Sequence, residues 1–148
     1  MSGLRPAAVA GPIGGLIGTG LAALALAGCS GGIIVQDDFY VQRSGNVPGA
    51  ALTIVVNDAG TATCDGKAPV PVTDPQLIQA RYIQTTIAPQ AQQGLTLPAG
   101  PRPVFHYTVR TPDGHVSFYD DSAHQPSIFG ALTLLTLQIA QGDCHLAL

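Results

Sequence analysis

Apolar and polar residues alternate strictly in two runs that flank the Thr-Pro-Asp-Gly sequence at 111–114. The apolar positions of these runs are Phe105, Tyr107, Val109, Val116 and Phe118. Because successive side chains of a strand point to opposite faces, these residues would share one buried face. The pattern therefore predicts an antiparallel hairpin with Arg110 opposite His115, buried on one side and exposed on the other.

Shorter stretches with β-branched or alternating residues predict three earlier strands, at 33–43, 51–56 and 61–64. The sequences Ser-Gly-Asn and Asn-Asp-Ala-Gly lie between them and are typical of turns. Together with the hairpin, these segments predict an antiparallel sheet of about four to five strands.

Helical spacing first appears after Thr73, which is a plausible N-cap with Gln76 as its reciprocal capping partner and Pro75 in the first turn. The apolar positions with this spacing are Leu77, Ala80, Ile83 and Ile87. We expect Pro89 to end the helix and residues 89–103 to form a proline- and glycine-rich connection.

A second helical pattern starts at Pro126 and is expected to end at Gly142 as the C-cap. Its core stripe comprises Ile128, Leu132, Leu135 and Ile139, with Phe129 and Leu134 beside it. The predicted fold class is therefore α+β, with the sheet packed by two helices in the order β-β-β-α-β-β-α.

An apolar, glycine-rich segment opens the chain, and Arg5 is the only charged residue in positions 1–34. Its most apolar part, 21–27, is too short to span about 30 Å of hydrocarbon unaided. A short charged start, an apolar run and then small residues form the layout of a secretory signal. We therefore expect residues 1–28 to direct export.

The sequence Leu26-Ala27-Gly28-Cys29 resembles the lipobox of bacterial lipoproteins, and the whole layout is similar to small lipoproteins of actinobacteria, including mycobacteria. The resemblance implies cleavage before Cys29, acylation of its thiol and often acylation of the new amino group. Residues 29–32 would then form a short tether, and the length and predicted elements of 33–148 indicate a single α+β domain. Two or more acyl chains anchor a protein stably in a membrane. The expected location is the outer face of the cytoplasmic membrane. The alternative is an ordinary secretory or uncleaved segment that happens to contain a cysteine.

Cys64 and Cys144 are the cysteines that remain once Cys29 is assigned to lipid. An even pair in an exported chain predicts a disulfide, which would tie the last helix to an early strand. The alternative is two free thiols or a metal pair, although no Cys-x-x-Cys spacing favours a metal.

Charged residues make up only 10 % of the chain, and the formal net charge is −3. A mildly acidic chain with scattered arginines lacks the basic patch that binds phosphate backbones, so we expect no nucleic-acid partner. The chain also lacks the HExxH motif and the Walker phosphate-binding loop. We accordingly expect no enzymatic activity, no cofactor and no metal.

Two groups of polar residues deserve comparison as sites. Asp120-Asp121-Ser122-Ala123-His124 could in principle supply a His-activated serine or metal ligands, but a polar loop whose side chains bond to the backbone is the simpler interpretation. The exposed hairpin face is the expected partner surface. Its residues are His106, Thr108, Arg110, His115 and Tyr119.

The domain sequence is also similar to the emfourin-like family, whose founding members inhibit thermolysin-like metalloproteases such as protealysin. The matching features, between residues 39 and 140, are FYVQRSG, Thr-Asp-Pro-Gln at the first helix, Leu97-Pro98 with the prolines after it, FHYTVRTPDGHVSFYDD, and Gln-Pro-Ser at the last helix. The resemblance implies an α+β fold and an inhibitory role. The lipid anchor, the two domain cysteines and the low charge depart from that family, and no inhibitory residue can be transferred.

The sequence thus predicts a membrane-anchored, exported lipoprotein that acts as a non-catalytic binding or accessory domain for an envelope protein. One alternative is an emfourin-like inhibitor of secreted metalloproteases, for which the 89–103 connection or the 111–114 turn could enter a protease. A second alternative is a carrier of an apolar ligand or lipid, which would need a hydrophobic cavity.

Overall fold

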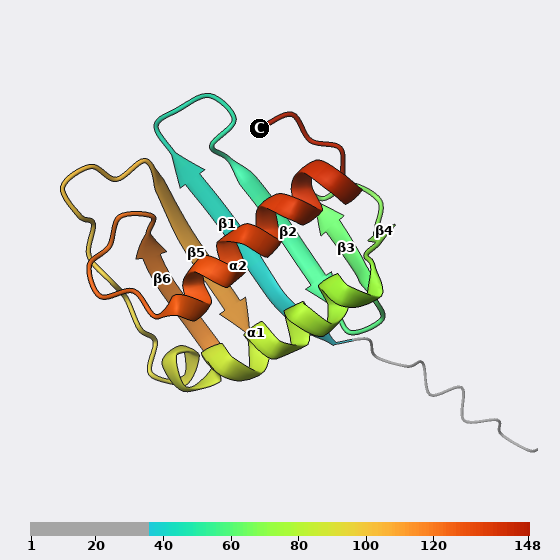
Figure 1. Ribbon diagram of the computed structural model, residues 1–148, viewed down its shortest axis with the longest axis horizontal. Helices are drawn as coiled ribbons and strands as arrows, with labels where there is room; N and C mark the ends of the chain where they lie inside the picture. The colour runs from blue at the N-terminus through green and yellow to red at the C-terminus, as the bar shows by residue number, and fades with distance from the viewer. Residues whose placement is uncertain (1–35) are drawn as a thin grey trace, which may run out of the picture. The chain divides into compact units, whose positions relative to one another are not determined.

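Within residues 36–148, six antiparallel strands form one sheet, and two α-helices cover one of its faces (Figure 1). The computed structural model describes these residues; the signal segment, the lipobox residues Leu26, Ala27 and Gly28, and Cys29 lie outside them. The strands are β1 (Asp37–Gly45), β2 (Leu52–Asn57), β3 (Thr61–Cys64), β4 (Val70–Pro71), β5 (Phe105–Thr111) and β6 (Gly114–Tyr119), and the helices are α1 (Asp74–Gln92) and α2 (Ser127–Gln138). The predicted α+β class is confirmed.

The strand order is β4-β3-β2-β1-β5-β6, so the described sheet has one strand more than the four to five expected. The additional strand, β4, pairs only two residues with β3 at the sheet edge. Its sequence, Val70-Pro71, is too short to show alternation, and proline is tolerated there because an edge strand leaves one row of backbone groups unpaired.

Strand β1 runs from Asp37 to Gly45, later than the predicted 33–43; residues 33–35 lie outside the described part. Its end moves to Gly45 because β1 pairs with β5 as far as Gly45 opposite Phe105. A side chain at Gly45 would overlap the carbonyl oxygen of Val104, so the close approach of the two strands requires glycine there.

The core lies between the sheet and the helices, where the strands present every second residue. Its largest fully buried side chains are Phe39, Phe118, Phe129, Ile54, Ile83, Ile87, Leu132, Leu135, Ile139, Val41, Val56 and Val109. Each such side chain contributes about 1.5–3 kcal/mol through burial. Tyr107, Phe118 and Phe129 stack in sequence, with centroid distances of 5.2 and 4.5 Å. Leu95 and Leu97 of the connection after α1 pack against this core.

The β5–β6 hairpin has the predicted register, with Arg110 opposite His115. Its turn lies so close to the end of α1 that a side chain at Gly114 would overlap the carbonyl oxygen of Ala91. The side-chain amides of Gln84 and Gln92 both donate to the Asp113 carboxylate, at 3.4 and 3.2 Å. The 111–114 turn is therefore held on the helix.

Helix α1 begins as predicted after Thr73, whose backbone N–H donates to Gln76 Oε1 at 2.7 Å. The prediction that Pro89 ends this helix is wrong, since α1 continues to Gln92. A proline inside a helix removes one backbone hydrogen bond. Burial of Ile87 and Ala91, on either side of the proline, keeps the last turn helical.

The prediction that Gly142 caps the last helix is also wrong. Helix α2 ends at Gln138 and passes into a π-helical turn, Ile139–Asp143, that contains Gly142. The N–H of Cys144 donates to the carbonyl of Ile139 at 2.9 Å, and Cys144 forms the predicted disulfide with Cys64 of β3. Leu134, expected beside the core stripe, is 53 % exposed. None of the helices described here is long and apolar enough to cross a membrane.

Replacing both Cys64 and Cys144 by alanine should lower the free energy of unfolding by about 4 kcal/mol, because the disulfide restricts the unfolded chain over a large loop. The two cysteines are 80 positions apart. Urea titrations of the oxidised wild type and the double variant measure the difference. Reduced wild-type protein is the matched control and should unfold like the variant. Equal stability of the oxidised and reduced wild type would contradict the prediction.

Candidate functional site

The sheet face opposite the helices carries all five residues of the predicted partner surface. His106 lies opposite Tyr119 across the hairpin, Arg110 lies opposite His115, and Thr108 is between them on β5. Arg110 and His115 are exposed, whereas the other three side chains are half-buried. The structure thus places these residues on one surface, which we call the open face of the hairpin.

Direct contacts order the open face of the hairpin at both ends. The rings of His106 and Tyr119 lie 4.5 Å apart between centroids, and His106 Nε2 is 2.7 Å from the Ser117 hydroxyl. At the other end, the Arg110 guanidinium lies 5.4 Å from the centroid of the Tyr40 ring, a cation–π arrangement. These contacts limit side-chain motion before any partner binds, which reduces the entropy lost on binding.

Tyr40 extends this surface onto β1, and sequence reasoning missed it. Tyr40 pairs with Val55 on one side and with Arg110 on the other, so a continuous row of side chains crosses β2, β1, β5 and β6. The alternation of Phe39 and Val41 with polar neighbours is visible in the sequence. That β1 lies beside β5 is a non-local pairing that no local pattern reveals.

A shallow hollow of about 360 Å³ lies at the His106 end of the open face. It is lined by Ser44, Gly45, Asn46, Pro103, Val104, Phe105, His106 and Tyr119. A hollow of this size is at the lower end of the range for small-molecule sites and can also receive a side chain of a partner.

Arg43 lies beneath this end of the sheet, on the helix side, and is only 4 % exposed. Its Nε donates to the carbonyl of Ala50 and its Nη2 to that of Gly49, both at 2.9 Å, and its guanidinium is 4.8 Å from the Phe105 ring centroid. Burial raises the pKa of the nearby Tyr107 hydroxyl, an effect that the Arg43 charge opposes. Arg43 thus holds the β1–β2 connection on the hairpin.

The Asp120–His124 cluster holds a loop rather than a reacting group. The Asp121 carboxylate accepts from the backbone N–H of Gly100 at 2.9 Å and of Arg102 at 2.6 Å, and Asp120 accepts from Val104 at 3.0 Å. Charge-assisted bonds of this kind are stronger than those between neutral groups. Residues 98–104 are therefore an anchored loop, the name used from here on.

Ser122 and His124 also have positions that favour a structural role. The Ser122 hydroxyl donates to the carbonyl of Pro98 at 2.7 Å and accepts from the N–H of Tyr119 at 2.9 Å. His124 is exposed, with a left-handed backbone (φ 59°). In the part of the chain that the structure describes, no three His, Cys, Asp or Glu side chains are placed to hold a metal ion.

Comparisons of this chain with protein-family models, with curated proteins and with solved structures found no match. The lipoprotein and emfourin-like assignments therefore stay predictions from sequence patterns.

Replacing Asp121 by asparagine should loosen the anchored loop, because an amide forms weaker hydrogen bonds to the two N–H groups than a carboxylate does. We expect faster hydrogen exchange of the Gly100 and Arg102 amides. If the hydrogen bonds to Asp121 become weaker by about 1.5 kcal/mol or more, exchange should be faster by roughly tenfold or more. Native-state exchange followed by NMR measures both rates. His124→Ala is the control and should leave them unchanged; unchanged exchange in Asp121→Asn would refute the anchoring role.

Proposed function

We propose that this chain is an exported, lipid-anchored protein whose domain binds a protein partner at the outer face of the cytoplasmic membrane, without catalysis. One observation carries the proposal. The disulfide uses Cys64 and Cys144, two of the three cysteines, and so leaves Cys29 of the lipobox for acylation. A disulfide is stable in an oxidising compartment, which agrees with export.

The open face of the hairpin supports a binding role. It displays tyrosine, histidine and arginine side chains on a rigid sheet, and tyrosine and arginine are enriched where protein interfaces bind most strongly. Both helices lie on the other side of the sheet, so within residues 36–148 no helix covers this face (Figure 1). The tether of a lipid-anchored chain would keep the face close to other envelope proteins.

A non-catalytic role is supported by the use of the reactive side chains. The residues most suited to catalysis by their types, Asp120, Asp121 and Ser122, are bonded to backbone groups of the anchored loop and of β6. A serine nucleophile needs a neighbouring base and an oxyanion site, whereas the Ser122 hydroxyl donates a hydrogen bond to the carbonyl of Pro98.

A second candidate function, inhibition of a secreted metalloprotease, is favoured by the anchored loop. Inhibitors gain affinity when the inserted loop is rigid before binding. Arg102 and the prolines around it are exposed, while the backbone is fixed from below by Asp120 and Asp121. The 111–114 turn is less suited, because it rests on α1. The carrier alternative gains no support, since none of the buried hydrophobic core residues lines the hollows described in residues 36–148.

The membrane anchor can be tested with Cys29→Ser in the full-length chain. We expect wild-type protein to incorporate an alkyne-labelled fatty acid and to sediment with membranes. The variant should lose the label, because it lacks the cysteine thiol that would be acylated. The Cys64→Ala, Cys144→Ala double variant controls for labelling at other cysteines and should keep the label. Equal labelling of wild type and Cys29→Ser would exclude this anchor.

The binding surface can be mapped with a photo-crosslinking residue at one of three exposed positions in the full-length chain in its own membranes. Gln42 lies on the open face opposite Thr108, Arg102 is on the anchored loop, and Tyr82, 64 % exposed on α1, is the control. A crosslinked product of a single mass that forms at Gln42, and not at Arg102 or Tyr82, supports the accessory role. A metalloprotease captured at Arg102 supports inhibition. The same adducts at all three positions would contradict both.

A further inference from the structure

An irregularity in β1 places one aspartate where a regular strand would not. The pairing with β2 shifts between Asp37, opposite Asn57, and Phe39, opposite Val56, so Asp38 is the extra residue of a β-bulge. Bulges redirect side chains and recur beside functional sites. As a result Asp38 and Phe39 are buried at consecutive positions, and Asp38 is only 8 % exposed.

Asp38 lines a cavity of about 340 Å³ between the start of β1, the β2–β3 turn and α1. The lining residues are Gln36, Asp37, Asp38, Asp58, Arg81, Gln84, Thr85 and Pro112. Asp38 Oδ2 is buried and has no hydrogen-bond partner in the described structure. A buried carboxylate oxygen without a donor is costly, so nearly all such groups are bonded in folded proteins.

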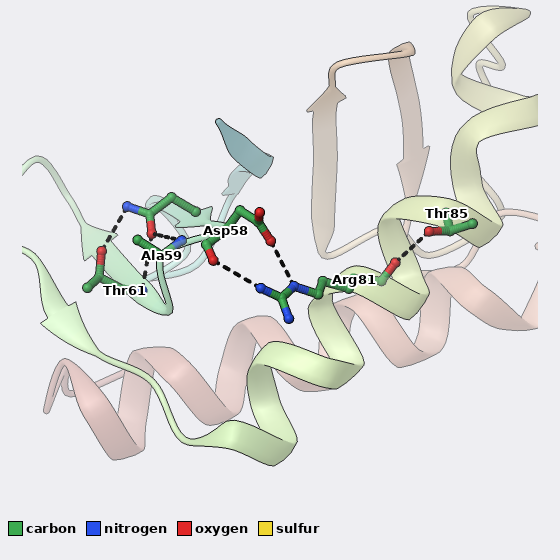
Figure 2. A network of polar contacts seen from close by, with 6 residues as sticks. Asp58, Ala59, Thr61, Arg81 and Thr85 are labelled. Atoms are coloured by element: carbon green, nitrogen blue, oxygen red, sulfur yellow. Dashed lines mark hydrogen bonds and ion pairs between the residues drawn. The ribbon is translucent and has the colours of Figure 1, made fainter. Parts of the chain in front are cut away.

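Arg81 does not supply the missing donor. Its Nε binds Asp58 Oδ1 at 2.8 Å and its Nη2 binds the Asp58 carbonyl at 3.1 Å (Figure 2). This is the one ion pair among residues 36–148, and both side chains are at least half exposed. The pair leaves Asp37 and Asp38 without a basic partner, so the residues that line the cavity carry a net negative charge.

The state of Asp38 agrees with this charge balance. Burial raises the pKa of the Asp38 carboxyl above its usual value, and the charges of Asp58 and Asp37 add to this effect, whereas that of Arg81 opposes it. A positively charged ligand beside Asp38 would favour the ionised carboxylate, and so offset both the desolvation by burial and the repulsion from the other aspartates.

We propose that this cavity binds an organic cation of the alkylguanidinium or alkylammonium class, with the Asp38 carboxylate as the central acceptor. Such cations carry several N–H donors spread over a few ångströms, which suits acceptors distributed around a cavity. A single metal ion needs ligands that converge, and no such group of three exists in residues 36–148. The side-chain N–H of Gln84 donates to the Asp113 carboxylate, which leaves the amide oxygen of Gln84 as a further acceptor.

A neighbouring hollow gives room for the rest of the ligand. It shares Gln36, Asp37 and Pro112 with the Asp38 cavity and continues to Tyr40 and Arg110. The alkyl chain or peptide backbone that bears the cation can lie there. This inference uses residues of the described domain alone and does not depend on export or lipidation.

The test is a calorimetric titration of the full-length chain, in detergent and with its disulfide intact, with acetyl-arginine amide. Acetyl-citrulline amide, which has a neutral urea of the same shape, is the matched ligand. We expect saturable binding of the arginine compound alone, and a roughly tenfold or greater loss of affinity in Asp38→Asn, since a hydrogen bond to a charged group is removed. Asp74→Asn, an exposed aspartate outside the cavity, should bind like wild type.

The stability of Asp38→Asn separates ligand binding from a purely structural role of Asp38. Ionised Asp38 is unfavourable in the folded protein at neutral pH, so we expect the variant to be at least as stable as wild type although it no longer binds the ligand. A purely structural role would instead lower the stability of the variant. Wild-type affinity should rise as the pH passes upward through the raised pKa of Asp38, with release of a proton on binding below it. This pH profile, and NMR shifts of the Asp38 and Thr85 amides, test the proposal even if the variant fails to fold.

Each remaining outcome has one meaning. Equal affinity for the free compound and for the peptide Gly-Gly-Arg-Gly-Gly supports a small-molecule cation, and tighter binding of the peptide supports a side chain of a protein. No binding, equal binding of the citrulline compound, equal loss in Asp38→Asn and Asp74→Asn, or binding of Ca²⁺ in place of the organic cation would overturn the proposal.

Discussion

Pairing of β1 with β5 is the constraint on which the rest of the structure depends. β1 lies between the β2–β3–β4 segment, which follows it in sequence, and the later β5–β6 hairpin. The ladder runs from Tyr40 opposite Arg110 to Gly45 opposite Phe105, so the paired residues are 70 to 60 positions apart. Without this ladder the two parts would be separate small sheets, each with too little apolar surface to be stable alone. The cost of closing the long loop is met by the apolar core shared across β1.

That central strand also makes the sheet two-sided. Phe39, Val41 and Arg43 face the helices, whereas Tyr40 and Gln42 join the polar rows of the hairpin on the other side. α1 and α2 cover the same face of the sheet (Figure 1). Alternate residues of the same strands therefore form the buried core on that face and the candidate partner surface on the other. The β-bulge at Asp38 breaks this alternation once, and the break is what brings a carboxylate beneath α1.

Carboxylates in this domain serve two different physical purposes. Asp120 and Asp121 accept backbone N–H groups of the anchored loop, and Asp113 accepts two glutamine amides of α1, so their charges are used to hold chain segments together. Asp38 is as inaccessible as the core yet has an oxygen without a donor. The contrast between satisfied and unsatisfied carboxylates is the reason to regard the Asp38 cavity as a site.

The sequence by itself determined the elements whose evidence is local: the hairpin with its register, the Thr73 cap, the disulfide partners and the five residues of the open face. Alternation and capping act over a few residues, and the disulfide partners follow from the number of cysteines once Cys29 is assigned to lipid. Only the tertiary structure decided that α1 continues past Pro89, that β4 exists and that Tyr40 joins Arg110. The bulge that buries Asp38 belongs with these, because each depends on packing or pairing between segments far apart in the chain, which overrides local propensity.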